Sequence, residues 1–298
     1  MNQLSDKELI DELKRRFSEN IKTIEELRRI TKELQVVNKK LEESEALKSH
    51  FISNITNEII NPFTSIIGLS KNILSVDKEN WKKVISMVAL IHSEAFNLDF
   101  QLRNIFVAAK IEAGEIYPEI MNVEIEGLVI SVIESFELEA RKKAIKFEHE
   151  FNMKKGDKPF LFKTDPEKIK LILANLLSNA LKYSHTEGTI KIKIKHEDNS
   201  RLCFKVQDFG TGISNENQKI IFDRFKRIDT GINSLNRGHG LGLSINKALL
   251  DLLDGTIEIQ STKNKGATFI FCIPEPDVDT GGTSTNGDDF MFEEGEIF

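Results

Sequence analysis

The stretch from residue 175 to residue 184 reads NLLSNALKYS, and its pattern of polar residues directs the interpretation of the whole chain. Asn175 and Asn179 lie four residues apart, so a helix places both amides on one face. Neutral amide oxygens on such a face can hold a Mg²⁺ ion that bridges phosphates. Lys182 can reach a phosphate as a point charge, and Tyr183 can pack against a base. A solvated polar helix face explains this motif, taken alone, equally well.

A second motif, DFGTGIS, spans residues 208–214 and follows a strand-like run. Gly210 and Gly212 lack side chains, so the backbone there can approach a ligand closely. A carboxylate fixed at Asp208 can accept a hydrogen bond from an exocyclic amino group, which is how adenine would be chosen. An ordinary turn at the end of a strand is the simpler alternative.

A third motif, GHGLGLSI, leads into an apolar helix that is predicted to begin within it. Gly238, Gly240 and Gly242 leave backbone N–H groups accessible, and the positive end of the helix dipole favours an anion there. His239 lies inside this glycine cradle, where it can touch a phosphate.

The polar stretch RIDTGINSLNR (227–237), between the second and third motifs, has the composition expected of a lid over a ligand. Phe222 and Phe225, in the run IFDRF, are predicted to anchor such a lid. Simple packing of both rings in the core is the alternative, and the two roles are compatible.

These motifs, in this order, resemble the ATP-binding domain of histidine kinases, a branch of the ATPase superfamily that includes gyrase, Hsp90 and MutL. The resemblance extends over residues 48–274. It implies that ATP is the ligand, that Asn175 and Asn179 contact Mg²⁺, and that Asp208 reads adenine. Gyrase-like and Hsp90-like enzymes place a catalytic Glu four residues before the metal-binding Asn, where this chain has Asn175, so the histidine-kinase branch is favoured. The ATP-binding residues implied in this way are Asn175, Asn179, Lys182, Tyr183, Asp208, Gly210, Gly212, Phe222, Phe225, Gly238, His239, Gly240, Leu241 and Gly242.

The segment FISNITNEIINPFTSIIGLS (51–70) resembles the dimerisation and phosphoacceptor helix of the same family, with one change. Asn57 stands at the position of the phosphate-accepting histidine, followed by Glu58, the general base in that family. An imidazole nitrogen has a free lone pair that can attack a γ-phosphoryl group. The lone pair of an amide nitrogen is delocalised into the carbonyl, so the chain is predicted to bind ATP without phosphorylating itself at position 57.

Several alternatives remain open at this stage. Asn61 matches the residue that in this family orients water against the aspartyl phosphate of a response regulator, which predicts a phosphatase without a histidine nucleophile. A third hypothesis is a non-enzymatic, ATP-sensing partner of another histidine kinase, or a kinase that acts on another chain. His50 is the first candidate for a substitute acceptor. Ile60 also replaces the family's usual basic residue, and two departures favour natural divergence over a single introduced substitution.

A stripe of apolar residues in the N-terminal region alternates steps of three and four, as in the heptads of a coiled coil. Its members are Leu27, Ile30, Leu34, Val37 and Leu41. One hairpin of helices cannot bury so long a stripe by itself, whereas two copies would form a four-helix bundle. A homodimer is therefore predicted.

The predicted fold class is α+β, because a helical N-terminal part precedes a mixture of helices and mainly antiparallel strands that forms an α/β two-layer sandwich. The predicted parts are a coiled-coil stalk (1–47), a helical hairpin (48–116), the ATP-binding sandwich (117–274) and an acidic, disordered tail (275–298).

Charge and composition restrict the classes of partner. The net charge is −6 over 298 residues, and eight of the acidic residues lie in the tail, so the rest is nearly neutral, which argues against nucleic-acid binding. No apolar run approaches the roughly 20 residues that span a bilayer, and a cytoplasmic location is expected. Cys203 and Cys272 are predicted to be two buried free thiols, without metal-ligand spacing.

Overall fold

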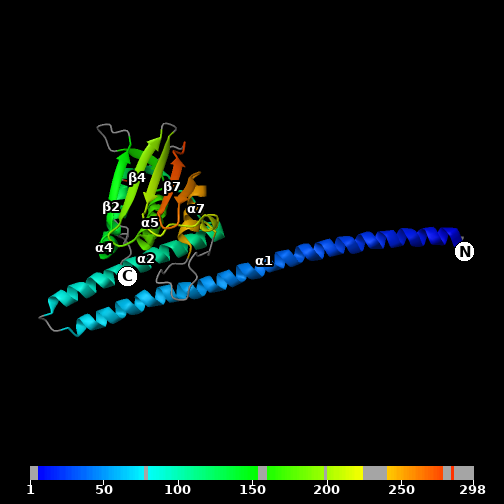
Figure 1. Cartoon of the computed structure of the whole chain (residues 1–298), viewed down its shortest axis with the longest axis horizontal. Coiled ribbons are helices and arrows are strands. Elements are labelled where there is room, and N and C mark those ends of the chain that lie inside the picture. Colours follow the sequence, from blue (N-terminus) through cyan, green and yellow to red (C-terminus); the bar gives the residue numbers. More distant parts are fainter. Residues whose placement is uncertain are drawn as a thin grey trace. The chain divides into compact units, whose positions relative to one another are not determined.

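The computed structural model describes residues 6–76, 80–153, 160–197, 200–223, 240–277 and 283–284. Contacts divide the chain into two compact units, Met1–Ser53 and Asn54–Phe298. Helix α1 (Asp6–Leu74) begins in the first unit and ends in the second (Figure 1).

In the first unit, α1 leaves its apolar stripe open to solvent. Leu27, Leu34 and Leu41 are each more than half exposed, at 57%, 56% and 57%. Polar neighbours on the same helix form exposed pairs four residues apart, such as Arg15 with Glu19 at 2.8 Å. The predicted helix is confirmed, and none of the residues that the structure describes covers the stripe.

The predicted helical hairpin is confirmed in the second unit. Pro62 lies inside α1 without ending it, and helix α2 (Trp81–Ala113) returns after the connection. Gly114 ends α2 in the left-handed conformation (φ 68°), where its N–H donates to the carbonyl of Ile111.

One face of α2 packs on the sandwich domain. The rings of Phe96 and Phe100 meet Phe136 edge-on, with centroids 5.3 and 6.0 Å apart. Ser93 donates a hydrogen bond to the Glu139 carboxylate at 2.9 Å and accepts one from the Lys142 ammonium. Phe106, further along the same helix, is 63% exposed.

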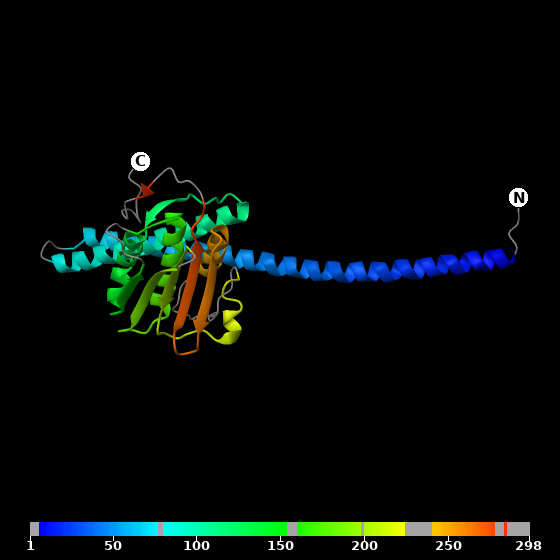
Figure 2. The same cartoon turned by 90° about the horizontal axis from the view of Figure 1, so that it is seen from above.

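The sandwich contains a five-stranded sheet in the order β2-β4-β5-β7-β6, in which β2 and β4 run parallel and the other neighbours antiparallel. A small second sheet has the order β3-β1-β8 (Figure 2). The strands are β1 (Met121–Glu124), β2 (Lys146–Asn152), β3 (Leu161–Thr164), β4 (Thr189–Glu197), β5 (Arg201–Gln207), β6 (Thr256–Ser261), β7 (Ala267–Pro274) and β8 (Thr283–Ser284). The helices are α3 (Ile125–Ser135), α4 (Glu137–Lys142), α5 (Pro166–Tyr183), α6 (Asn215–Gln218) and α7 (Gly242–Leu252).

Alternation along the central strands directs every second side chain into the core. Ile192, Phe204 and Phe271 are at most 1% exposed, and the two phenyl rings stack with centroids 4.5 Å apart. Helix α5 is buried on almost all sides, because it contacts α3 and α7 as well as β5. The predicted α+β fold with an α/β sandwich is confirmed.

The structure differs from the prediction in several elements. Residues 126–143, whose sequence pattern predicts a single helix, are divided at Phe136 into α3 and α4, and Phe136 is only 3% exposed. The short strands β1 and β3 were not predicted. Within the tail that was expected to be disordered, Thr283–Ser284 pairs in parallel with β1.

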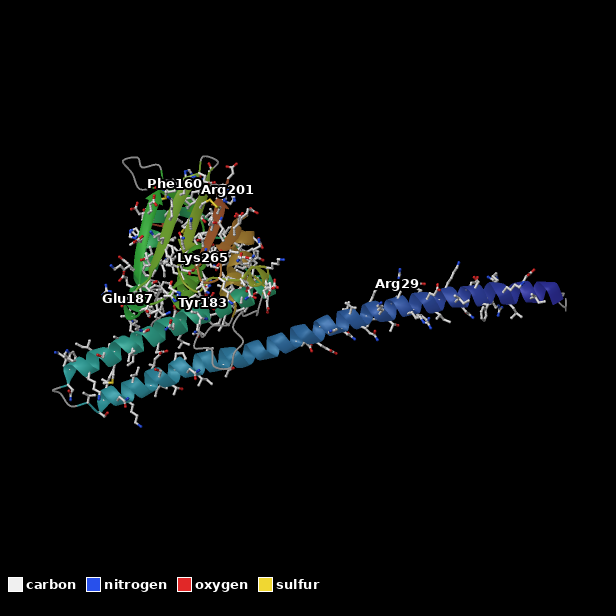
Figure 3. The ribbon with its side chains drawn as sticks, in the orientation of Figure 1. Arg29, Phe160, Tyr183, Glu187, Arg201 and Lys265 are labelled. Atoms are coloured by element: carbon white, nitrogen blue, oxygen red, sulfur yellow. A yellow bond between two sulfur atoms is a disulfide. The ribbon has the colours of Figure 1, made fainter. Side chains whose placement is uncertain are left out.

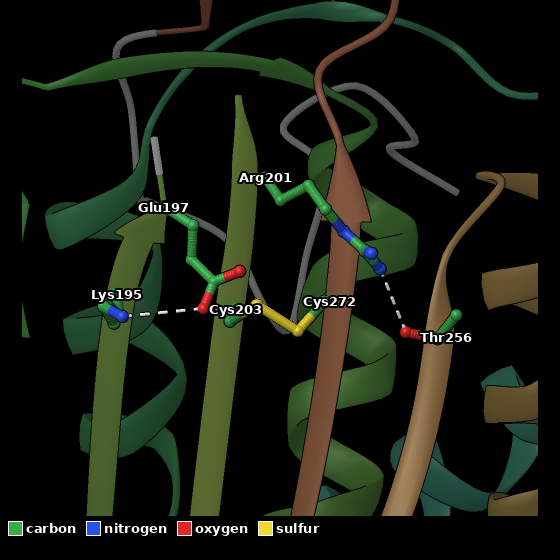
Figure 4. Close-up of a disulfide and its surroundings, with 6 residues drawn as sticks. All are labelled: Lys195, Glu197, Arg201, Cys203, Thr256 and Cys272. Atoms are coloured by element: carbon green, nitrogen blue, oxygen red, sulfur yellow. Dashed lines mark hydrogen bonds and ion pairs between the residues drawn. A yellow bond between two sulfur atoms is a disulfide. The ribbon is translucent and has the colours of Figure 1, made fainter. Parts of the chain in front are cut away.

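The prediction of two free thiols was wrong. Cys203 and Cys272 lie directly opposite each other on β5 and β7, with Cα atoms 4.1 Å apart, and form a disulfide (Figure 4). Their 69-residue separation gave no indication of the pairing, which comes from the register of two adjacent strands. Both are half-buried on the sheet face that points away from the core, together with Arg201 and Lys195.

Among the described residues, no helix combines the length and apolar character that a bilayer span requires.

Candidate nucleotide-binding site

Helix α5 carries the first motif and begins at a well-defined cap. Asp165 accepts a hydrogen bond from the N–H of Lys168 at 3.1 Å and another from the N–H of Glu119 at 2.7 Å. Pro166 follows at the first helical position, where a missing N–H costs nothing. The helix is therefore fixed at its start, and its later turns present Asn175, Asn179 and Lys182.

The two asparagines of the motif differ in burial. Asn175 is 3% exposed and donates hydrogen bonds from Nδ2 to Oδ1 of Asn246 at 2.9 Å and to the carbonyl of Gly242 at 3.4 Å. Asn179 is only half-buried. Asn175 thus connects α5 to the start of α7, while both amides remain on one helix.

The second motif forms a tight turn after β5. Asp208 is 6% exposed, and its Oδ1 accepts hydrogen bonds from the N–H groups of Gly210 at 3.0 Å and Ala267 at 3.3 Å. The main chain of Asp208 also donates to the carbonyl of Ala267 at 2.9 Å. These bonds hold the carboxylate in one orientation, with Oδ1 occupied by the protein.

Burial raises the pKa of Asp208 above its ordinary value, because desolvation penalises the charged carboxylate. The N–H groups of Gly210 and Ala267 and the charge of His185 oppose that rise. A buried, oriented carboxylate of this kind is a common feature of binding sites.

The glycine at position 210 is required by a close approach of two backbones. A Cβ there would overlap the carbonyl of Tyr183 and lie 2.9 Å from Cα of Ser184. The adjacent N–H of Thr211 donates to the same Tyr183 carbonyl at 3.2 Å. The turn at 208–212 is therefore joined to the C-terminal end of α5.

Lys182 and Tyr183 lie at that end of α5. The Lys182 ammonium lies 5.2 Å from the centroid of the Tyr183 ring, and Tyr183 is 37% exposed. Figure 3 shows Tyr183 and Glu187 at the end of the sheet opposite Phe160 and Arg201. Lys143 donates to the carbonyls of Leu181 and Lys182 at 2.6 and 3.1 Å, and burial lowers its pKa.

Of the third motif, the structure describes the residues from Gly240 onward. Gly240 has φ 69° and Leu241 is 4% exposed, so the turn brings the chain back into the core before α7 begins at Gly242. No side chain of the described residues caps the first turn of α7. Among the described residues the N–H groups of this turn therefore have no capping side chain, and such groups suit an anion.

The remaining predicted site residues are half-buried, exposed or outside the described part of the chain. Phe222 is half-buried, whereas Phe225, Gly238 and His239 lie outside the described residues, as does the stretch 227–237. Asn57 and Glu58 belong to α1, and their side chains also lie outside the described part. Asn61 is exposed on α1. Around α5 the structure brings together Asn175, Tyr183, Asp208, Gly210 and Gly242.

Two residues at the site were missed by sequence reasoning. Asn246, fully buried on α7, bonds to Asn175, and a polar residue within an apolar helix face was the available signal. Gly266 has φ 84°, and a Cβ there would overlap the carbonyl of Asp208. In the sequence, only the turn-forming composition of KNKG (263–266) indicated a special role for Gly266.

Comparisons with known proteins found a family match and several relatives. Residues 164–277 match the family described as histidine kinase-, DNA gyrase B-, and HSP90-like ATPases. The chain has the core of a sensor histidine kinase. It combines that ATPase-family domain with a preceding helical hairpin.

Two curated relatives cover most of the chain. The circadian input-output histidine kinase CikA of Synechococcus elongatus is 30% identical over 236 residues, which is 77% of this chain and 30% of the relative. The sensor histidine kinase GacS of Pseudomonas protegens is 30% identical over 264 residues, 87% of this chain and 28% of the relative. This chain therefore spans about a third of the length of these relatives or less.

A solved structure shows the same fold at lower identity. Full-length ShkA, crystallised in complex with AMPPNP, aligns with a TM-score of 0.53 and 23% identity. The alignment covers 77% of this chain and 45% of ShkA.

Proposed function

We propose that this chain binds Mg²⁺-ATP at the site around α5 and acts as a two-component signalling core that does not phosphorylate itself at position 57. The observation that carries the proposal is that α5 contacts both other motifs. Its Asn175 bonds to the carbonyl of Gly242, and its Tyr183 carbonyl accepts from Thr211 in the turn that holds Asp208. Three motifs that are each weak alone thereby become one site.

The donor set fits this ligand. Oδ1 of Asp208 is held by two backbone N–H groups, which leaves Oδ2 to accept from the exocyclic amino group of adenine. The amide oxygens of Asn175 and Asn179 are ligands that suit Mg²⁺. The uncapped first turn of α7 suits phosphate oxygens. When bound, Mg²⁺ neutralises charge on the phosphates.

The missing step is nucleophilic attack. Asn57 occupies the acceptor position of the hairpin, and its amide nitrogen has no available lone pair for the γ-phosphorus. Nucleotide binding cannot replace a nucleophile, so ATP would serve as a conformational ligand of the sandwich domain.

The test is to incubate the purified chain with Mg²⁺ and γ-labelled ATP and to measure nucleotide binding in the same sample. We expect saturable binding without acid-labile label. Label on the chain would contradict the assignment of Asn57 as the functional break, and His50 would then be examined first by substitution.

The exposed stripe on α1 supports a homodimer. Leu27, Leu34 and Leu41 together with Phe63 on the hairpin present large apolar side chains to solvent. A second copy would bury them in a coiled coil and a four-helix bundle. Crosslinking of differently tagged chains distinguishes this from pairing with another histidine kinase, which is the alternative partner.

A second candidate function is a response-regulator phosphatase. Asn61 is exposed on α1, so its amide can reach a receiver domain that docks on the hairpin. Asn61→Ala should abolish dephosphorylation of a cognate phosphorylated regulator, with the exposed Thr64→Ala as the matched control. Unchanged dephosphorylation by Asn61→Ala would exclude this role.

A further inference from the structure

Asn246 is a buried residue on α7 that the sequence motifs did not include among the predicted site residues. Asn246 is 0% exposed, and its neighbours Ile245, Leu249 and Leu250 are buried apolar residues. A buried amide is costly unless its hydrogen bonds are made. Both ends of this amide are bonded: Nδ2 donates to the carbonyl of Ile172 at 3.1 Å, and Oδ1 accepts from Nδ2 of Asn175 at 2.9 Å.

These bonds have a fixed direction. The carbonyl of Ile172 can only accept, so Asn246 must turn its nitrogen toward Ile172 and its oxygen toward Asn175. Asn175 must then present its own nitrogen to Asn246. The order of donors and acceptors is set by a backbone group, so it does not depend on an arbitrary choice between the two ends of an amide.

The second N–H of Asn175 is also directed to an acceptor, the carbonyl of Gly242 at 3.4 Å. With the nitrogen committed to Asn246 and Gly242, the oxygen is the atom of Asn175 that is left for a metal ion. A Cβ at position 242 would lie 3.1 Å from this oxygen, so glycine keeps the space beside it clear.

We propose that Asn246 is a positioning residue, which fixes the amide of Asn175 so that its oxygen, and not its nitrogen, faces Mg²⁺. The proposal rests on the proposed function, since it concerns the same Mg²⁺-ATP site. Groups that orient a metal ligand commonly change metal affinity about 10–100-fold when they are removed. The same bond ties the metal ligand on α5 to the start of α7, where phosphates are proposed to bind.

The deciding variant is Asn246→Leu, which replaces the amide by an apolar side chain of similar size. It removes the acceptor that holds the nitrogen of Asn175, so the amide can turn either way. Binding of ATP would be measured by calorimetry over a series of Mg²⁺ concentrations, beginning with excess chelator. We expect the apparent Mg²⁺ affinity of the ATP complex to fall about 10–100-fold, with metal-free ATP binding unchanged.

Asn246→Asp is the matched control. Ionised or protonated, its side chain keeps an oxygen that accepts from Asn175, so we expect it to retain most of the Mg²⁺ dependence that Leu removes. The double variant Asn175→Ala with Asn246→Leu should lose no more Mg²⁺ affinity than Asn175→Ala alone, because both act through one ligand.

The outcomes separate the alternatives. If Asn246 only joins two helices, Asn246→Leu will weaken metal-free and Mg²⁺-dependent binding equally, which would overturn the proposal. If the unaltered chain binds no ATP, the proposed function fails first and this inference with it. Should Asn246→Leu be too unstable to measure, Asn246→Ala removes the acceptor with a small side chain that suits a helix, and the same fall in Mg²⁺ affinity is expected.

Discussion

The sandwich domain and the N-terminal part of α1 place their apolar side chains in opposite environments. In the sandwich, Ile172, Phe204 and Phe271 are completely buried by the chain's own strands and helices. Along α1, Leu13, Phe17 and Leu34 are 59%, 70% and 56% exposed. One region completes its core alone and carries the candidate site, whereas the other leaves its large apolar side chains exposed.

The same contrast applies to chemistry. The sandwich carries the described residues that are proposed to hold a nucleotide, while the hairpin has Asn57 at the proposed acceptor position. A substitution at position 57 is therefore expected to change phosphotransfer without removing a group that is proposed to hold the nucleotide.

The largest expected effect would come from Asn57→His. Supplying an imidazole with a free lone pair to a domain that already binds ATP should raise acid-labile label from background to a large fraction of the chains. Asn57→Gln, which keeps an amide, is the control and should stay at background. Absence of label on Asn57→His despite ATP binding would mean that the hairpin lacks more than the nucleophile, with Ile60 the next position to change.

Breaking the apolar stripe should have the next largest effect. The double variant Leu27→Asp, Leu34→Asp places two charges in the proposed coiled-coil seam. Burial of each leucine side chain contributes about 1.5–3 kcal/mol, so we expect the affinity of the dimer to fall more than about 100-fold. Sedimentation velocity over a range of concentrations measures this. Lys32→Asp, off the stripe, should leave the dimer intact. A dimer that survives the double change would place the interface elsewhere.

Asp208→Asn tests the sandwich itself. Replacing the carboxylate by an amide exchanges an acceptor for a donor opposite the adenine amino group, and ATP affinity should fall by about 1–3 kcal/mol. Calorimetry in saturating Mg²⁺ measures the change, with the exposed Asp251→Asn as control. Equal affinity in the two variants would remove Asp208 from the adenine site.

The same variant should have a small, pH-dependent effect on stability. The pKa of Asp208 is raised by burial in the folded state, so its ionisation lowers the free energy of unfolding as pH rises through that pKa. Asp208→Asn should therefore raise Tm modestly at neutral pH, and the gain should disappear in acid, where both side chains are neutral. A gain that grows toward acid pH would have the opposite sign and would contradict the raised pKa.

Much of this arrangement was predictable from local pattern. Strands β4 and β5 alternate strictly, α5 has its cap and early proline, and Asn175, Asp208 and Gly210 stand at spacings set by those elements. The hairpin followed from helical periodicity interrupted near residue 76.

What was missed depends on tertiary contacts. The break at Phe136 exists because that ring is buried against Phe96 and Phe100, far away in the sequence. The Cys203–Cys272 pair depends on strand register, and β1 and β3 have four residues each, too few for a periodic signal. The role of Asn246 can be recognised only from its hydrogen bond with Asn175, which the sequence does not reveal.

Two consecutive lysines lie on either side of a single peptide bond and hold different parts of the molecule. The Lys142 ammonium bonds to Ser93 on hairpin helix α2, and the Lys143 ammonium bonds to the carbonyls of Leu181 and Lys182 at the end of α5. One planar peptide unit and the two lysine side chains therefore connect the contact on α2 with the contact at the end of α5. Any sliding of α4 along the hairpin would therefore pull on the segment that also carries Tyr183 and the turn beside it, and the hairpin would have a mechanical connection to the nucleotide site that does not pass through the phosphates.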